Sequence, residues 1–199
     1  MIKHILFDAD GVLVHAEMWS NELQRRYGVT HEQVQPFYRG IFQETLSDKR
    51  DLKEIIEPYL KEWGWPKTVD AFLNEWFEYE HILDEAFISY IQKLRAKGIK
   101  CYVATNQEKY RGQYMIDKMG FGNSFDKVFV SAHLGTQKPA EQFFHKIVDE
   151  LGANKDEVLF WDDDKQNIAG AKEYGIHAEF FESFDKFKDI MKDKYEISI

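Results

Sequence analysis

Hydrophobic residues along the chain repeat with two different spacings, and the change between them lies near residue 83. Between residues 15 and 80, aromatic residues and leucines recur every three or four positions, which predicts amphipathic helices and no strand. The expected helices span residues 17–28, 30–42, 50–65 and 67–80. Four of the five tryptophans fall in this region, and we interpret them as the packed core of a helical bundle.

Beyond residue 83, helical and strand-like segments alternate to the end of the chain. Strands are expected at 99–105, 127–132, 157–162 and 176–181, and helices at 84–98, 107–122, 140–152, 165–175 and 183–195. This alternation is typical of βαβ units, in which helices cover both faces of a parallel sheet. The sequence therefore predicts an α/β protein with a doubly wound parallel sheet and a helical insertion after the first strand. The expected core comprises residues 1–14 and 82–199, and the expected cap comprises residues 15–81.

The first strand of the expected sheet ends in two carboxylates. An apolar run over residues 5–7 leads into Asp8 and Asp10, which are separated by one residue, and Gly11 then allows a sharp turn. Ligands of open α/β sheets bind at the carboxyl ends of the strands, so both acids are candidates for chemistry. A purely structural turn is the alternative, because Asp side chains bond their own backbone. A calcium loop is excluded, since three apolar residues follow where oxygen ligands would be needed.

The composition is that of an ordinary globular protein. Of the 199 residues, 44% are hydrophobic and 31% are charged. The first apolar run is cut short by Asp8, so we expect no signal peptide, no membrane span and a cytoplasmic location. The single cysteine, Cys101, lies in an apolar run and is expected to be a buried, inert thiol.

The formal net charge of −9 argues against nucleic acid as a partner, because phosphate backbones are held by clustered lysines and arginines. The basic residues of this chain are dispersed among acids. A small anionic substrate remains compatible with this charge only where a local cation or metal reverses the field.

Polar residues also lie at the end of the second expected strand and in the loop after the third. Thr105 and Asn106 stand where a strand gives way to a helix, whose free amides favour an anion, although an ordinary helix cap is the simpler interpretation. Lys138 lies in the loop GTQKPA before a helix, and taken alone it would be read as a solvated lysine.

Three consecutive acids follow the next expected strand. Asp164 is the expected helix cap, which leaves Asp162 and Asp163 without a role in secondary structure. Because parallel strands bring their carboxyl ends to one edge, all of these groups should converge on one crevice. Adjacent carboxylates repel unless a cation neutralises them, and hard oxygen ligands select Mg²⁺. A lysine, a hydroxyl and helix amides around that metal describe a site for a phosphoryl group.

Four segments of the chain resemble, in order, the four motifs of the haloacid dehalogenase (HAD) superfamily of hydrolases. They are DADGVL, VATN, the lysine of QKP, and WDDDKQN. The likeness spans nearly the whole chain and implies a Rossmann-like core, and the insertion after the first motif resembles the helical cap of the first subclass. Taken as an ordered set the motifs are highly specific, although no single one would be.

The resemblance implies a Mg²⁺-dependent phosphomonoester hydrolase that works through an aspartyl phosphate. Asp8 matches the nucleophile, and Asp10 matches the general acid and base. Thr105 and the backbone of Asn106 match the groups that bind the phosphate, and Lys138 matches the cation that spans nucleophile and phosphate. A carboxylate nucleophile splits the displacement into two steps, with the cations offsetting the charge between two anions.

The resemblance also implies the ligands of the metal. Asp8 and the backbone carbonyl of Asp10 match ligands from the first motif. Asp163 aligns with the principal metal carboxylate of the fourth motif, and Asp162 with its partner. The expected partner of the protein is a small phosphorylated metabolite, with no nucleic acid and no membrane, and the expected assembly is a monomer or a dimer.

Other activities on related scaffolds stay open to different degrees. True dehalogenases usually lack an acid at the position of Asp10, so Asp10 favours phosphate esters. A phosphonate hydrolase would need a buried cap lysine, which nothing in the sequence marks. A sugar phosphomutase shares the core residues and is harder to exclude. A non-enzymatic phospho-receiver module is the alternative of a different class, but receivers place their acids in another order and lack the insertion.

The substrate is not determined by the sequence. Five residues of the cap and its hinge could face it, and each is as readily explained as a solvated or core residue: His15, Trp19, Tyr38, Arg39 and Arg50.

Overall fold

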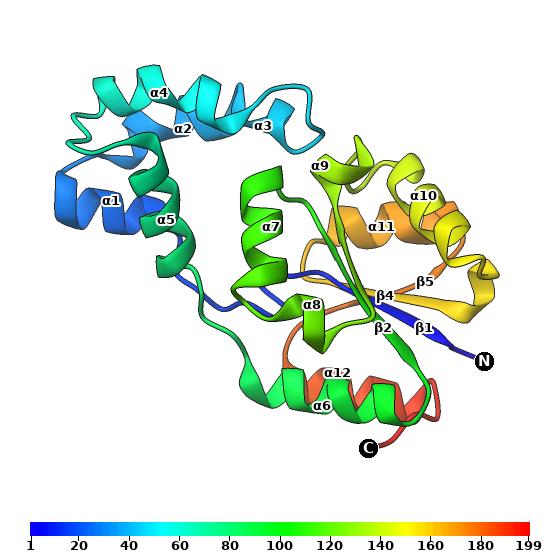
Figure 1. Ribbon diagram of the computed structural model, residues 1–199. Coiled ribbons are helices and arrows are strands. Elements are labelled where there is room, and N and C mark those ends of the chain that lie inside the picture. The colour runs from blue at the N-terminus through cyan, green and yellow to red at the C-terminus, as the bar shows by residue number, and fades with distance from the viewer.

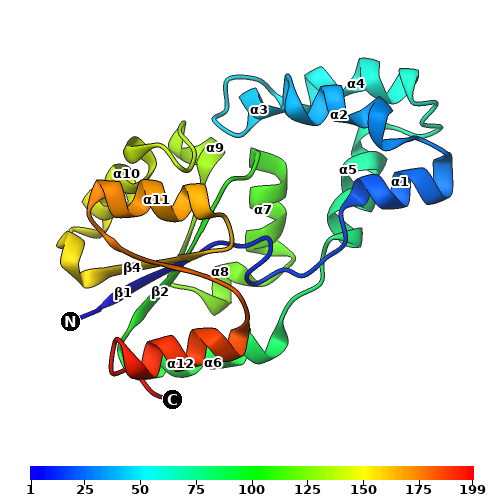
Figure 2. The same ribbon diagram turned by 180° about the vertical axis from the view of Figure 1, so that it is seen from behind.

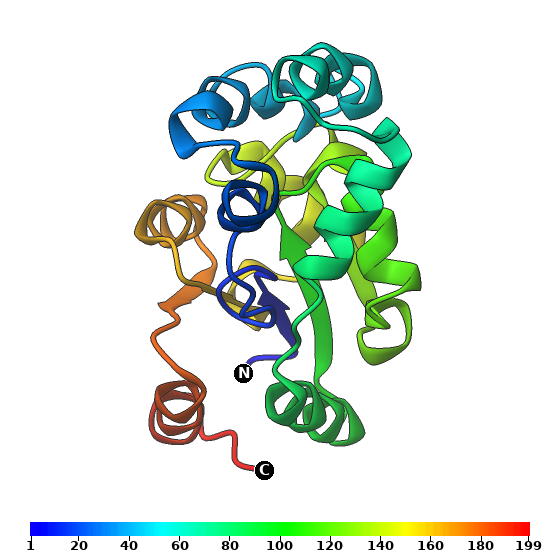
Figure 3. The ribbon, with the colours of Figure 1, turned by 90° about the vertical axis from the view of Figure 1, so that its left-hand side faces the viewer.

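The computed structural model describes residues 1–199 as a helix-covered sheet with a separate group of helices inserted after its first strand (Figure 1). The inserted helices stand over one end of the sheet, and both termini lie at the end of the core away from them (Figures 1 and 3). No helix combines the length and the apolar character needed to cross a membrane.

The sheet has five parallel strands in the order β3-β2-β1-β4-β5. They are β1 (His4–Phe7), β2 (Lys100–Thr105), β3 (Lys127–Val130), β4 (Val158–Asp162) and β5 (His177–Phe180). The chain reverses its direction of travel across the sheet at β1, which lies between β2 and β4. This is the topological switch point, where open α/β sheets bind ligands at the carboxyl edge. The predicted doubly wound parallel sheet is confirmed.

Helices cover both faces because successive strand residues point to opposite sides. In β1, Ile5 and Phe7 are buried in one hydrophobic cluster and Leu6 in another. Figure 2 shows α10 and α11 on one side of the sheet and α6 and α12 on the other. The core helices are α6 (Glu85–Ala96), α7 (Lys109–Asp117), α8 (Phe121–Ser124), α9 (Ser131–Leu134), α10 (Glu141–Leu151), α11 (Lys165–Tyr174) and α12 (Phe184–Asp193), and a short 3₁₀ helix, η1, spans Lys155–Glu157.

The inserted helices form a hydrophobic core of their own. They are α1 (Trp19–Tyr27), α2 (His31–Arg39), α3 (Phe42–Thr45), α4 (Leu52–Glu62) and α5 (Val69–Tyr79). Fourteen buried residues make up this core, among them all four tryptophans of the region, which agrees with the predicted bundle. Phe37 and Phe72 are fully buried at its centre.

The two chain segments that connect the insertion to the core run side by side. The amide of His15 donates to the carbonyl of Ile82 at 2.9 Å, and the amide of Asp84 donates to the carbonyl of Leu13 at 3.0 Å. We propose to divide the chain at this paired hinge, with residues 1–14 and 82–199 as the core and residues 15–81 as the cap.

Helix α3 was not predicted, and two further segments differ from the sequence prediction. The strand expected at 127–132 ends at Val130, because the Ser131 hydroxyl donates to the carbonyl of Gln107 and accepts from its amide at 3.1 and 3.0 Å. The helix expected at 107–122 is broken by Gly120, whose φ of 78° starts α8. The end of β3 depends on a contact between distant parts of the chain, which the hydrophobic periodicity of the sequence does not record.

Candidate active site

A lysine buried at the carboxyl edge of the sheet joins two carboxylates. Lys138 Nζ lies 2.7 Å from Asp8 Oδ1, just after β1, and 2.6 Å from Asp162 Oδ2, at the end of β4. The Lys138 side chain is 0% exposed, so the alternative of a solvated lysine does not apply. Burial raises the pKa of Asp8 to about 7, and the positive charge of Lys138 opposes that rise.

The side chain of Asn106 fixes the backbone that carries Lys138. Its amide nitrogen donates to the carbonyl of Lys138 at 3.0 Å, and its oxygen accepts from the amide of Lys138 at 2.9 Å. This two-point contact holds the loop before α10 against the end of β2, and it was not predicted from the sequence. Thr105, 1% exposed, precedes Asn106 and lines the same cavity as Asp8 and Lys138.

Three donor groups contact the carboxylate of Asp162. Its Oδ1 accepts from the Asp164 amide at 2.7 Å, its Oδ2 accepts from Lys138, and the Asn167 side chain nitrogen lies 3.1 and 3.0 Å from the two oxygens. Asp162 is therefore placed to hold Lys138, and its role as a metal ligand beside Asp163 stays a prediction.

Asp163 turns toward the first strand. Carboxylate oxygens of Asp8, Asp162 and Asp163 lie within 4.8 Å of one another, which fits a divalent cation with hard oxygen ligands. Gly11 allows this approach, because it adopts φ +79° and a Cβ there would lie 2.1 Å from Asp163 Oδ2. Asp8 accepts only at Oδ1, from the Ala9 amide and from Lys138, so its other oxygen is available to a metal beside Asp163.

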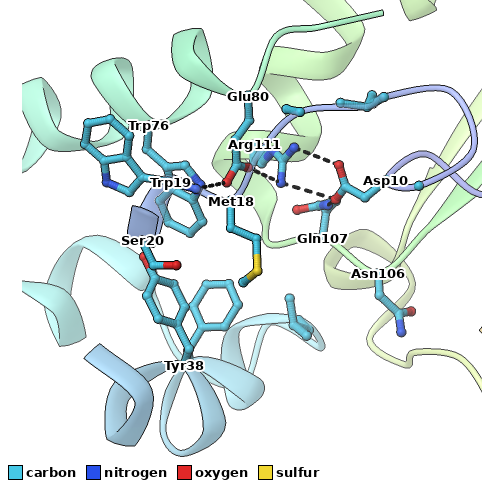
Figure 4. A pocket seen from close by; sticks show the side chains of 15 residues that line it. Asp10, Met18, Trp19, Ser20, Tyr38, Trp76, Glu80, Asn106, Gln107 and Arg111 are labelled. Atoms are coloured by element: carbon cyan, nitrogen blue, oxygen red, sulfur yellow. Dashed lines mark hydrogen bonds and ion pairs between the residues drawn. The ribbon is translucent and has the colours of Figure 1, made fainter. Parts of the chain in front are cut away.

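Asp10 is held by groups that the sequence analysis did not identify. Arg111 Nη2 donates to Asp10 Oδ1 at 2.8 Å and Arg111 Nη1 to Asp10 Oδ2 at 3.2 Å, while the Gln107 side chain donates to the same Oδ2 (Figure 4). Arg111 is buried in the first turn of α7. Nothing in the local pattern separates it from a solvated helical arginine, so only the fold reveals the contact.

The same arginine links the core to the inserted helices. Arg111 Nη1 also lies 2.8 Å from Glu80 Oε2, just after α5, and Glu80 Oε1 accepts from the amide of Trp19 at 2.8 Å. Burial raises the pKa of Glu80, and the charge of Arg111 opposes that rise. The position of Asp10 is thus coupled, through one guanidinium, to both ends of the insertion.

The model of haloacid dehalogenase-like hydrolases matches residues 5–180 of the chain. The chain belongs to this family. Over 192 residues it is 26% identical to D-ribitol-5-phosphate phosphatase of Bacteroides thetaiotaomicron, covering 88% of this chain and 90% of that protein. A 107-residue stretch, 52% of the chain, is 29% identical to drimenol cyclase drtB of Aspergillus calidoustus, of which the chain spans only 20%.

A solved structure of similar shape comes from the same HAD family. It is a HAD family enzyme of Bacteroides thetaiotaomicron in complex with magnesium and inorganic phosphate. The TM-score is 0.78 at 18% sequence identity, over 94% of this chain and 99% of that one. The similarity confirms the HAD fold.

Lys138→Ala should destabilise this HAD hydrolase strongly. The substitution leaves the carboxylate of Asp162, which is 0% exposed, without its cation, and breaking such a buried pair costs about 3–5 kcal/mol. Urea unfolding followed by circular dichroism measures the loss. Lys172→Ala, an exposed lysine on α11, is the matched control and should change stability by less than about 0.5 kcal/mol. Equal stabilities for the two variants would contradict the buried pair, whereas adding Asp162→Asn to Lys138→Ala should restore part of the loss.

Proposed function

We propose that this HAD hydrolase is a Mg²⁺-dependent phosphomonoesterase that acts on a small phosphorylated metabolite through an aspartyl phosphate on Asp8. The observation that carries the proposal is the contact of Lys138 with Asp8 at the switch point of the sheet. A buried cation beside a carboxylate nucleophile is what attack on a phosphate dianion needs, because nucleophile and substrate are both negative.

Mg²⁺ would be held by the side chains of Asp8 and Asp163 and by the backbone carbonyl of Asp10. When bound, it would offset the charge of the phosphate and of the carboxylates around it. The residues fit such an ion, since the acid oxygens converge within 4.8 Å and no other cation than Lys138 touches Asp8. Thr105 and the amide of Asn106 complete the expected phosphate site at the end of β2.

The reaction would proceed in two displacements. In the first, an oxygen of Asp8 forms a bond to phosphorus as the ester oxygen leaves, and Asp10 gives that oxygen a proton. In the second, Asp10 takes a proton from water, which attacks phosphorus and frees Asp8 and inorganic phosphate. Arg111 and Gln107 would act as positioning residues, because they fix the Asp10 carboxylate.

The relatives agree with this chemistry. The ribitol-5-phosphate phosphatase removes phosphate from a small ester, and the similar solved structure binds magnesium and inorganic phosphate. A dehalogenase needs no proton for its leaving group, whereas Asp10 is fixed in this site by two side chains.

Chelation tests the proposal directly. The protein should release nitrophenol from 4-nitrophenyl phosphate in Mg²⁺ and lose at least about a hundredfold in rate in EDTA, because clustered acids repel a phosphate dianion without a cation. Returning Mg²⁺ in excess over the chelator should restore the rate. Full activity in EDTA would overturn the metal dependence, and no activity in either condition would overturn the phosphatase assignment.

A further inference from the structure

A second cavity adjoins the phosphate site and extends from Asp10 beneath the inserted helices. Its volume is about 340 Å³, and it shares Asp10, Gly11, Ala16, Met18 and Asn106 with the cavity that contains Asp8 and Lys138. Asp10 is the group expected to protonate the leaving oxygen, so the space beside it on the side away from Lys138 is where the leaving group would lie. This volume is at the small end of the range of about 300–1,000 Å³ for ligand pockets.

The cap side of this cavity is aromatic and aliphatic. Trp19, Tyr38, Phe42, Leu46 and Trp76 line it, and Figure 4 shows the rings of Trp19, Trp76 and Tyr38 around the side chain of Met18. Phe42 and Leu46 come from α3 and its C-terminal end, a helix that the sequence did not predict. Walls of this kind favour an apolar ligand, because flat rings bury large area with little loss of conformational freedom.

The charged side chains of the cavity are already bonded to one another, and Gln107 is bonded to one of them. Arg111 contacts Asp10 and Glu80, Glu80 also accepts from the Trp19 amide, and Gln107 donates to Asp10. A ligand rich in hydroxyl groups would therefore find few acceptors for its protons and would lose hydrogen bonds to water on binding.

Three buried polar groups of the wall make no hydrogen bond: the Tyr38 hydroxyl and the indole N–H groups of Trp19 and Trp76. Burial, followed by the charge of Glu80, raises the pKa of Tyr38. An indole N–H only donates, so of these three groups only the Tyr38 hydroxyl can also accept, whereas every hydroxyl of a sugar or polyol has a proton to donate. No cation in this cavity is left for a second phosphate, because the guanidinium of Arg111 lies between two carboxylates.

We propose that this cavity binds the leaving group of the substrate and selects phosphate monoesters of compact apolar alcohols or phenols over sugar and polyol phosphates. The proposal rests on the proposed phosphomonoesterase function and specifies its substrate class. Binding of the leaving group in the transition state would raise kcat/KM, and the increase would grow with the apolar area that the cavity removes from water.

A series of alkyl phosphates measures that contribution. Methyl phosphate leaves the cavity empty and reports the reaction alone, while butyl, pentyl and hexyl phosphate fill it stepwise. We expect kcat/KM to rise by up to about fourfold for each added methylene, and ribitol 5-phosphate to be at least about tenfold poorer than hexyl phosphate. If methyl phosphate is hydrolysed but ribitol 5-phosphate equals or exceeds hexyl phosphate, the leaving-group inference fails and the phosphatase function stands.

Binding of the free alcohol separates the two proposals without turnover. Trp19 and Trp76 line the cavity, so cyclohexylmethanol should change the tryptophan fluorescence of the protein in a saturable way, and ribitol should not. Saturable binding with no hydrolysis of any ester would remove the phosphatase function and keep the apolar site. Equal responses to both alcohols, or none to cyclohexylmethanol, would overturn the inference.

Two substitutions in the cavity wall test it further. Leu46→Asn places an amide among the rings and should lower the ratio of kcat/KM for hexyl over methyl phosphate by about tenfold. Leu60→Asn, which is buried in the cap but does not line the cavity, is the matched control and should leave that ratio unchanged. Met18→Gln is a second cavity variant that is expected to fold, because Met18 lines the cavity yet is 69% exposed. This variant should also lower the ratio of kcat/KM for hexyl over methyl phosphate. An unchanged ratio in both cavity variants would contradict the assignment.

Discussion

Asp8→Asn should abolish turnover of every phosphate ester, with a loss of roughly 10⁴-fold or more in kcat. An amide is too poor a nucleophile to form the covalent intermediate, although its size and shape match those of the carboxylate. Steady-state release of phosphate, with Mg²⁺ present and deamidation excluded by mass spectrometry, measures the effect. The variant should remain folded, because Lys138 keeps its contact with Asp162 at 2.6 Å.

Asp164→Asn is the matched control for this substitution. Asp164 caps α11 by accepting from the amide of Gln166 at 2.7 Å, and Asn serves as a cap about as well as Asp. The control should keep a rate close to that of the wild type. Wild-type turnover by Asp8→Asn itself would remove Asp8 from the nucleophilic role and with it the two-step mechanism.

Asp10→Ala should fail at a different step from Asp8→Asn. Nitrophenolate leaves without a proton, so this variant should still transfer the phosphoryl group from 4-nitrophenyl phosphate to Asp8. It lacks the base that activates water, so steady turnover should fall by about 10²–10⁴-fold. Rapid mixing should then show a burst of nitrophenol approaching one equivalent per active site, followed by slow release.

Two comparisons sharpen this experiment. With an alkyl phosphate, whose leaving oxygen does need a proton, the burst of Asp10→Ala should disappear, and Asp8→Asn should show no burst with either substrate. Arg111 keeps Glu80 as its partner in the variant, so the fold should survive the loss of Asp10. Rapid turnover of both substrates by Asp10→Ala, with no phosphoenzyme trapped by acid, would assign the acid and base role to another group.

The network around Asp10 connects this acid to the inserted helices, which also line the second cavity. Arg111 reaches Asp10 and Glu80 at 2.8 Å each, and Glu80 binds the start of α1 through the Trp19 amide. A movement of the cap that shifts Glu80 would change the partners of Arg111 and hence the hold on Asp10. Hydrogen bonds between charged groups are stronger than those between neutral groups, so the present arrangement of the cap is one in which Asp10 is firmly fixed.

The sequence by itself determined the layout of the core. Hydrophobic periods of two and of three to four residues identified the strands and most helices. The residues buried on one face of a strand or helix recur in the sequence with the period of that element. Since parallel strands place their carboxyl ends together, the sequence alone assigns the polar residues that follow them to one site. Asp8, Lys138 and Asp163 are brought together at that edge.

Only the tertiary structure decided what each polar group is bonded to. Three contacts join residues far apart in the chain, and no local period encodes them. They are the contact of Lys138 with Asp162, the two hydrogen bonds of Asn106 to Lys138, and the contact of Arg111 with Asp10.

Only the tertiary structure decided which cap residues line the second cavity. Of the five candidates, Trp19 and Tyr38 line it, whereas Arg39 is exposed outside it, Arg50 is 60% exposed beside Glu44, and His15 lies near Asp84. Helical spacing shows that a residue lies on a buried or a solvated face. Which wall a buried face forms depends on how the cap docks over the sheet, and that is set by contacts between the two parts of the molecule.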